Sequence, residues 1–237
     1  MSMKILSLDS SATCASVCLY DADSNKIIGE FFINTKLTHS QTLVPMIDSL
    51  LSCTNHSLSD VDCFAVNVGP GSFTGIRIGV SVVKGMAMPE DKHCVDVSTL
   101  ESMAYNFIDY NNIVVCACMD ARRNQVYNAL FSIENGCVKR LCEDRAIAID
   151  DLFAQLSDVC APIVLVGDGA KLCYNSRPQD FDIELACEQR RYQRASCVAL
   201  CAVDKIKSNE VKNAQSLMPT YLRPSQAERE RINKEKE

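Results

Sequence analysis

The sequence has no tryptophan, and only three histidines and nine glycines occur among its 237 residues. None of its fourteen cysteines forms a Cys-x-x-Cys pair, so the usual spacing of a zinc site is missing. Acidic residues outnumber basic ones by 30 to 24. The net charge of −6 therefore argues against a chain that grips a nucleic-acid backbone alone, although a local basic patch stays open. No uninterrupted apolar run approaches the length of a membrane span.

The composition supplies ample material for a folded core. Hydrophobic residues make up 47% of the chain and charged residues 23%, and 237 residues suffice for one large or two small domains. The apolar stretch within residues 1–9 is too short for a secretory signal peptide. We therefore expect a cytoplasmic protein without membrane attachment. Its cysteines should be reduced thiols that act as small hydrophobic residues rather than disulfides or metal ligands.

The most informative stretch is 69–79, Gly-Pro-Gly-Ser-Phe-Thr-Gly-Ile-Arg-Ile-Gly. It follows an apolar run, 61–68, that is typical of a buried strand, and it leads into a helix predicted over 73–88. A P-loop would need Gly-Lys-Ser/Thr where Gly75 and Ile76 stand, and a dinucleotide fingerprint would need glycine at Thr74. Neither nucleotide motif fits.

What remains is a ladder of glycines at four-residue spacing, at 71, 75 and 79. On a helix this spacing clears one face, so that another backbone can approach closely. Glycine costs about 1 kcal/mol relative to alanine inside a helix, which indicates a packing purpose. A tight turn followed by a helix on its own sheet explains the ladder equally well, and the sequence leaves both explanations open.

A second amphipathic helix is predicted over 40–51, with an apolar stripe formed by Leu43, Met46, Ile47 and Leu50. In the glycine helix, Ile76, Val80 and Val83 suit the chain's own sheet, whereas Ile78 and Val82 point elsewhere. A stripe of large apolar side chains must be covered, either by the chain's own sheet or by another protein.

Two polar loops follow strands in corresponding halves of the chain. The first strand ends in Asp9-Ser10-Ser11, and a later apolar strand ends in Gly167-Asp168-Gly169. Such loops can hold a phosphate, or they can merely cap turns. Between them, Arg122 and Arg123 follow another strand; they could contact phosphate or a partner's carboxylate, or form a solvated turn.

The stretch 69–79 resembles the signature of the bacterial TsaB (YeaZ) family. The segments 39–47, 120–127, 167–170 and 219–223 agree with it, so the resemblance spans nearly the whole chain. It implies an α/β fold of two actin-like (ribonuclease H-like) lobes, each a mixed sheet with helices. We expect an N-terminal lobe over 1–110, a C-terminal lobe over 111–224 whose last helix can pack back on the first lobe, and a charged tail over 225–237.

The resemblance also implies a role. The family is a non-catalytic partner of the transferase TsaD. It works with the ATPase TsaE to place threonylcarbamoyl on the adenosine beside the anticodon of transfer RNA. By this resemblance the chain forms a homodimer when alone and meets tRNA only through the complex. The partner interface would comprise Leu43, Met46, Ile47, Leu50, Gly75, Ile78, Gly79 and Val82. No cofactor is certain; ATP or ADP at the complex interface is the candidate, held by Asp9, Ser10, Ser11, Gly167, Asp168 and Gly169.

TsaD carries a His-x-x-x-His metal pair on the helix that corresponds to the one beginning near residue 98. Thr99 and Met103 stand in those positions here, so we expect no metal site and no catalytic residue. Two other functions stay open. One is an ATP-dependent phosphotransferase or ATPase of the actin-like superfamily, supported by the two loops. The other is a nicotinamide-dependent oxidoreductase, supported only by Asp96 and a near-miss glycine pattern.

Overall fold

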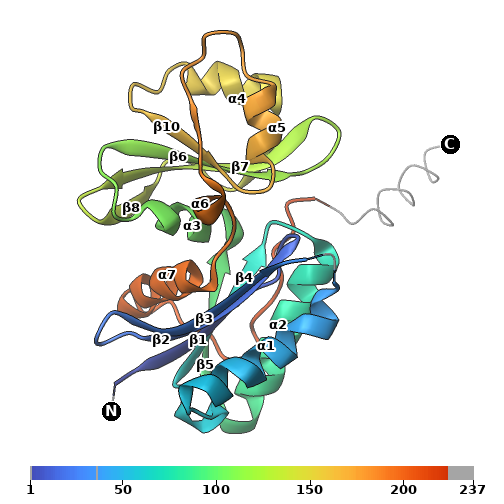
Figure 1. Ribbon diagram of the computed structural model, residues 1–237, viewed down its shortest axis with the longest axis vertical. Coiled ribbons are helices and arrows are strands. Elements are labelled where there is room, and N and C mark those ends of the chain that lie inside the picture. Colours follow the sequence, from blue (N-terminus) through green and yellow to red (C-terminus); the bar gives the residue numbers. More distant parts are fainter. Residues whose placement is uncertain (1, 36, 224–237) are drawn as a thin grey trace, which may run out of the picture.

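A computed structural model describes residues 2–35 and 37–223, and the expected charged tail at 225–237 lies outside this part of the chain. The described residues form two mixed sheets stacked as the centres of two lobes (Figure 1). Helices lie outside each sheet and also between the two sheets, which gives five layers. The expected fold of two mixed sheets flanked by helices is confirmed.

Within the described residues, the first lobe contains a five-stranded sheet of order β3-β2-β1-β4-β5. The antiparallel meander and the two parallel strands that follow are β1 (Lys4–Asp9), β2 (Cys14–Asp21), β3 (Lys26–Asn34), β4 (Cys63–Gly69) and β5 (His93–Ser98). β1 pairs antiparallel with β2 and parallel with β4, so it is the central strand. It is buried from its second residue onward, because helices cover both of its faces.

Two helices, α1 (His39–Thr54) and α2 (Phe73–Ala87), cover the outer face of this sheet. Short 3-10 turns follow at Leu58–Asp60 and Met88–Glu90. At the start of α2 the hydroxyl of Ser72 accepts a hydrogen bond from the Gly75 amide, and this cap satisfies a donor that the first turn leaves free. The core beneath both helices is aliphatic, with Leu6, Leu8 and Val66 fully buried.

The second lobe repeats this order. Its strands are β6 (Ile113–Asp120), β7 (Gln125–Glu134), β8 (Cys137–Arg140), β9 (Arg145–Ala148), β10 (Ile163–Val166) and β11 (Glu184–Leu185). In the described part of the chain they form a sheet of order β11-β10-β6-β7-β8, with β9 also paired to β7. Helices α4 (Ile149–Leu156) and α5 (Ala170–Asn175) cover its outer face.

Two of the helices between the sheets pack on the sheet of the opposite lobe. Helix α3 (Thr99–Ala104) follows the first sheet in sequence, and the 3-10 turn Tyr105–Phe107 continues it, yet its apolar side packs in the core of the second sheet. Helix α7 (Ala195–Lys207), preceded by the short α6 (Glu188–Arg191), follows the second sheet but packs on the first. The return of the last helix to the first lobe agrees with the expected arrangement, whereas the packing of α3 on the second sheet departs from the expected lobe 1–110.

Polar contacts fix α7 on the first lobe. The Glu30 carboxylate of β3 accepts hydrogen bonds from the amide and hydroxyl of Ser196, at 3.0 and 2.9 Å, and pairs with Arg194 at 2.8 Å. It thereby satisfies free donors in the first turn of α7. The hydroxyl of Ser7 donates to the Ala195 carbonyl at 2.7 Å. These contacts tie the end of the chain to its beginning.

All fourteen cysteines are free thiols. Burial raises the pKa of Cys14, Cys63 and Cys197 to about 12, so these groups behave as small neutral hydrophobes. Among the described helices, none has both the length and the apolar character that a membrane crossing requires.

Candidate functional site

The apolar stripe of α1 is covered by the chain itself. Leu43 and Leu50 have no exposed surface, and Met46 and Ile47 keep only 8% and 4%. All four lie in the core between α1 and the first sheet. The stripe therefore faces the chain's own sheet and not a partner, and of these four residues Ile47 also lines the open groove on the outer surface. The amphipathic pattern predicted a covered face, and the chain's own sheet is what covers it.

The glycines of α2 also face inward. A Cβ atom at Gly75 would lie 2.0 Å from the Ser10 carbonyl oxygen, and one at Gly79 would lie 2.5 Å from the Ser10 hydroxyl. The same hydroxyl donates a hydrogen bond to the Gly75 carbonyl at 2.8 Å. Gly75 and Gly79 thus let the β1–β2 loop approach α2 closely. The expectation that they set the distance to a partner helix is wrong, because their missing side chains point into this chain.

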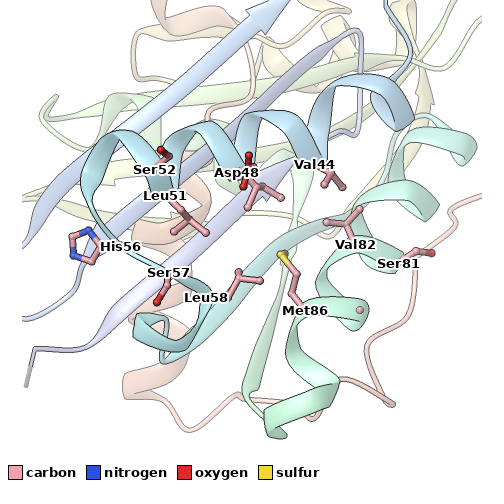
Figure 2. Close-up of a pocket in the computed structure, with 12 residues that line it drawn as sticks. Val44, Asp48, Leu51, Ser52, His56, Ser57, Leu58, Ser81, Val82 and Met86 are labelled. Atoms are coloured by element: carbon pink, nitrogen blue, oxygen red, sulfur yellow. The ribbon is translucent and has the colours of Figure 1, made fainter.

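An apolar groove remains open on the outer surface, between α1 and α2. It has a volume of about 620 Å³, and Val44 and Leu51 of α1 and Val82 and Met86 of α2 are among its lining residues (Figure 2). Val44 is 55% exposed, whereas Val82 is only partly buried against the core. Ile78 is likewise partly buried. Of the residues expected at a partner interface, Ile78 and Val82 are partly buried and the other six are buried, and Ile47 and Val82 line this groove.

The polar groups of the first loop form hydrogen bonds within the chain. Asp9 is fully buried, and its Oδ1 atom accepts hydrogen bonds from the Ser11 hydroxyl at 2.6 Å and from the Asn67 amide at 2.8 Å. Burial raises the pKa of Asp9 despite these hydrogen bonds. The carbonyl of Ser11 accepts from the Ser72 amide at 2.7 Å. The polar groups of Ser11 are therefore engaged within the chain.

The second polar loop is engaged in a similar way. Gly167 has φ of 99° and donates its amide to the Arg191 carbonyl at 2.6 Å, and Gly169 donates to the Cys118 carbonyl at 3.0 Å. Glycine is needed at 167 because this φ disfavours any side chain and a Cβ would lie 2.1 Å from the Cys118 carbonyl. Burial raises the pKa of Asp168, which lies between the two glycines, to about 6.

The two loops meet at one cleft between the lobes. The cleft has a volume of about 640 Å³, and Ser11, Asp168 and the start of α2 line it together with Asp120 and Arg122. A volume of this size accommodates a small ligand. The sequence thus identified two loops that the fold brings to the same cleft. The charged side chains that line it are the carboxylates of Asp120 and Asp168 and the guanidinium group of Arg122.

The positions compared with a metal pair are unsuited to ligation. Thr99 and Met103 have no exposed surface, and Met103 packs in the core of the second lobe. Across residues 2–35 and 37–223, no group of three or more His, Cys, Asp or Glu side chains could hold a metal ion. Asp96, the residue behind the dinucleotide alternative, forms an ion pair with Lys212 at 2.6 Å.

The sequence did not predict how the last described segment runs. Residues 209–223 return along the first lobe, where the Thr220 amide donates to the Val68 carbonyl. The Tyr221 ring stacks on Phe73 with centroids 4.4 Å apart, and Arg77 donates to the Tyr221 hydroxyl at 2.7 Å. Arg223 then reaches the second lobe, where it donates to the Ala121 carbonyl at 3.2 Å. No local pattern signals contacts across about a hundred residues of sequence.

A duplicated mixed sheet with a loop from each lobe at a shared cleft defines a two-lobed α/β protein of the actin-like class. The family model for TsaD, tRNA N6-adenosine threonylcarbamoyltransferase, matches residues 26–230. The tRNA threonylcarbamoyladenosine biosynthesis protein TsaB of Bacillus subtilis is 28% identical over 236 residues, which cover 99% of this chain and 100% of that protein. TsaB of Escherichia coli is 35% identical over 136 residues, 56% of this chain and 58% of that protein.

The solved structure of YeaZ from Pseudomonas aeruginosa superposes with a TM-score of 0.81 at 26% identity, covering 93% of this chain and 100% of that one. The chain therefore belongs to the TsaB (YeaZ) family, and the resemblance found in its motifs is confirmed.

Proposed function

We propose that this chain is a non-catalytic partner subunit in the transfer of threonylcarbamoyl to the adenosine beside the anticodon of transfer RNA. In this role it binds TsaD and works with the ATPase TsaE. Membership of the TsaB family supports the pathway. The family model that it matches is that of a threonylcarbamoyltransferase.

The non-catalytic role is supported chiefly by the identity and burial of two residues in α3. Thr99 and Met103 occupy the positions compared with the metal-binding histidines of TsaD; both are fully buried, and Met103 packs in the apolar core of the second lobe. A thioether and a buried hydroxyl are poor ligands for a hard or borderline metal ion. Restoring the ligands would require space that the core of the second lobe already fills.

The partner site that we propose is the groove between α1 and α2. Val44 is 55% exposed and lies beside the partly buried Val82 and Met86, so an apolar surface is open to a partner helix (Figure 2). Burying one such side chain contributes about 1.5–3 kcal/mol, so a few of them decide whether a complex forms. In the absence of TsaD the same self-complementary surface would pair two copies of this chain as a homodimer.

The test compares Val82→Glu with Ile27→Glu, since Ile27 is an apolar residue of β3 that is 48% exposed. Val82→Glu should leave the chain folded but abolish both the homodimer and the complex with TsaD in sedimentation velocity. Ile27→Glu should change neither. Met46→Glu should instead unfold the protein, because only 8% of Met46 is exposed. An unchanged complex with the Val82→Glu chain would mean that TsaD binds elsewhere.

A second candidate is an ATP-dependent phosphotransferase, favoured by the meeting of the two polar loops at one cleft. The amides of Gly167 and Gly169 are engaged within the chain, which leaves fewer donors for phosphate. Purified chain incubated with ATP and magnesium separates the two functions. Turnover by the isolated chain would favour the phosphotransferase. Transfer to tRNA that needs both this chain and TsaD would favour the partner subunit.

A further inference from the structure

Four arginines lie along the mouth of the cleft and come from both lobes. We call Arg77, Arg122, Arg123 and Arg223 the arginine rim. Contacts connect two of them along this edge, because Arg77 donates to Tyr221, and Arg223, two residues further on, donates to the Ala121 carbonyl. Arg122 and Arg123 follow Ala121 directly in sequence. Arg223 also donates to the Gln125 side chain, so the rim spans the β6–β7 connection and the start of α2.

None of the four guanidinium groups has a carboxylate partner among the described residues. Three of the other six arginines in the described part of the chain form ion pairs, Arg140 with Asp144, Arg190 with Asp109 and Arg194 with Glu30. In a protein of net charge −6, four unpaired arginines gathered at one edge form a local positive surface. Such a surface is the usual footprint of a ligand with phosphate groups.

The backbone that presents the rim is unusual. Arg122, Arg123 and Asn124 have φ of 64°, 54° and 57°, the left-handed region that side chains other than glycine seldom adopt. All three residues are exposed, so burial does not account for this conformation. The Arg122 amide donates to the Asp120 carboxylate at 2.7 Å, and the Gln125 amide donates to the Arg122 carbonyl at 3.2 Å. Backbone strain of this kind, maintained by surrounding hydrogen bonds, is concentrated at functional sites.

We infer that the arginine rim binds the phosphate backbone of the transfer RNA, so that this subunit contacts the RNA directly. The inference rests on the proposed function for the identity of the RNA. The cleft behind the rim carries the carboxylates of Asp120 and Asp168, which disfavour a nucleotide triphosphate inside it. Arg122 lines the cleft beside these carboxylates, and the four arginines as a set are spread over both lobes, which suits an extended polyanion better than a compact one.

An aromatic pair at the same edge supports an RNA ligand. Tyr221 is 39% exposed and stacks on Phe73 with an angle of 8° between the ring planes. The guanidinium carbon of Arg77 lies 5.5 Å from the Tyr221 centroid. Unpaired bases of RNA stack on exposed aromatic rings beside arginines, and this combination recurs in proteins that bind single-stranded loops.

The test measures the binding of an unmodified tRNA transcript by fluorescence anisotropy over a series of salt concentrations. It uses the full chain alone and the full chain with TsaD. The double variant Arg122→Ala/Arg123→Ala removes two rim charges from an exposed turn. Its matched control, Lys139→Ala/Arg177→Ala, removes two exposed charges on β8 and after α5. The rim variant should bind at least about tenfold more weakly than the control. Its log–log salt slope should be smaller by about 0.7–0.9 for each lost phosphate contact.

The outcomes separate this inference from the proposed function. Equal RNA affinity of the rim variant and the control would overturn it, as would wild-type protein that binds no tRNA in either form. Loss of TsaD binding by the rim variant with tRNA binding intact would overturn it in favour of a partner's carboxylates. Loss of ATP binding with tRNA binding intact would overturn it in favour of a nucleotide. Failure of wild-type chain to bind TsaD would count against the proposed function alone.

Discussion

Helix α2 contains two glycines whose replacement by alanine should have opposite effects. A Cβ atom at Gly75 would lie 2.0 Å from the Ser10 carbonyl oxygen, whereas one at Gly85 would meet nothing within 4 Å. Both residues lie inside Phe73–Ala87, so alanine removes the same helix penalty at each, about 1 kcal/mol. The pair therefore isolates the packing role of Gly75 from its helix propensity.

The loss of stability expected for Gly75→Ala depends on how far Ser10 must be displaced. The distance to the Ser10 carbonyl oxygen would have to grow from 2.0 to 3.4 Å to restore an ordinary contact, yet Ser10 is tied to α2 by the hydrogen bond from its hydroxyl to the Gly75 carbonyl. Overpacking of a close-packed site costs about 1–3 kcal/mol, and losing a buried hydrogen bond costs about 1 kcal/mol more. After the gain in propensity, Gly75→Ala should lower the free energy of unfolding by about 1–3 kcal/mol. Gly85→Ala should raise it by about 0.5–1 kcal/mol.

Urea denaturation of both variants and the wild type, followed by far-UV circular dichroism, measures the difference. The m-values should agree, because the same surface is exposed on unfolding. Equal stability of the Gly75→Ala and Gly85→Ala proteins would refute the conclusion that the glycine ladder serves packing within this chain. A stable Gly75→Ala protein that no longer bound TsaD would restore the role of the ladder in partner approach.

Two further predictions concern ionisation and thiol reactivity. Burial raises the pKa of Asp168 from its ordinary 3.8 to about 6, so its ionisation costs stability as pH rises through this window. Asp168→Asn should therefore raise the free energy of unfolding by about 1–3 kcal/mol at pH 7.5 and by little at pH 3.5; equal effects at both pH values would contradict this. Exposed Cys53, Cys137, Cys160 and Cys187 should react with a thiol reagent in the native protein, the partly exposed Cys142 more slowly, and the nine buried cysteines mainly after unfolding. Fast native reaction of Cys14 or Cys63, identified by mass spectrometry, would contradict the burial that raises their pKa.

Much of the fold could be predicted because local pattern and family resemblance agreed. The antiparallel meander at the start, the strand before Gly69 and the apolar stripe of α1 all occur where the sequence indicated them. The loops at Asp9 and Gly167 both reached the cleft between the lobes. Each of these features depends on residues close together in sequence, where periodicity and turn chemistry are informative.

The sequence could not show which surface covers the apolar face of a helix. The spacing of Leu43, Met46, Ile47 and Leu50 requires a covering surface, but periodicity is the same whether a sheet or a partner provides it. The family resemblance, and no local pattern, indicated that the last helix packs back on the first lobe, because its contacts span 188 residues in the hydrogen bond from Ser7 to Ala195. The packing of α3 on the second sheet had no signal in the sequence. The arginine rim depends on the return of residues 209–223, which carries no local signal.

Helix α2 connects these observations, because successive residues of a helix turn by about 100° and so address different surroundings. Gly75 faces the Ser10 loop, Ile76 is buried in the core, Arg77 turns to Tyr221 at the cleft mouth, and Val82 lines the outer groove. One helix thus fixes the first loop while presenting a charged edge and an apolar groove in different directions. If RNA lies on the edge and TsaD in the groove, the two can be held at once without competing for the same side chains. Substitution of Val82 should then weaken TsaD binding without changing the affinity of the isolated chain for tRNA.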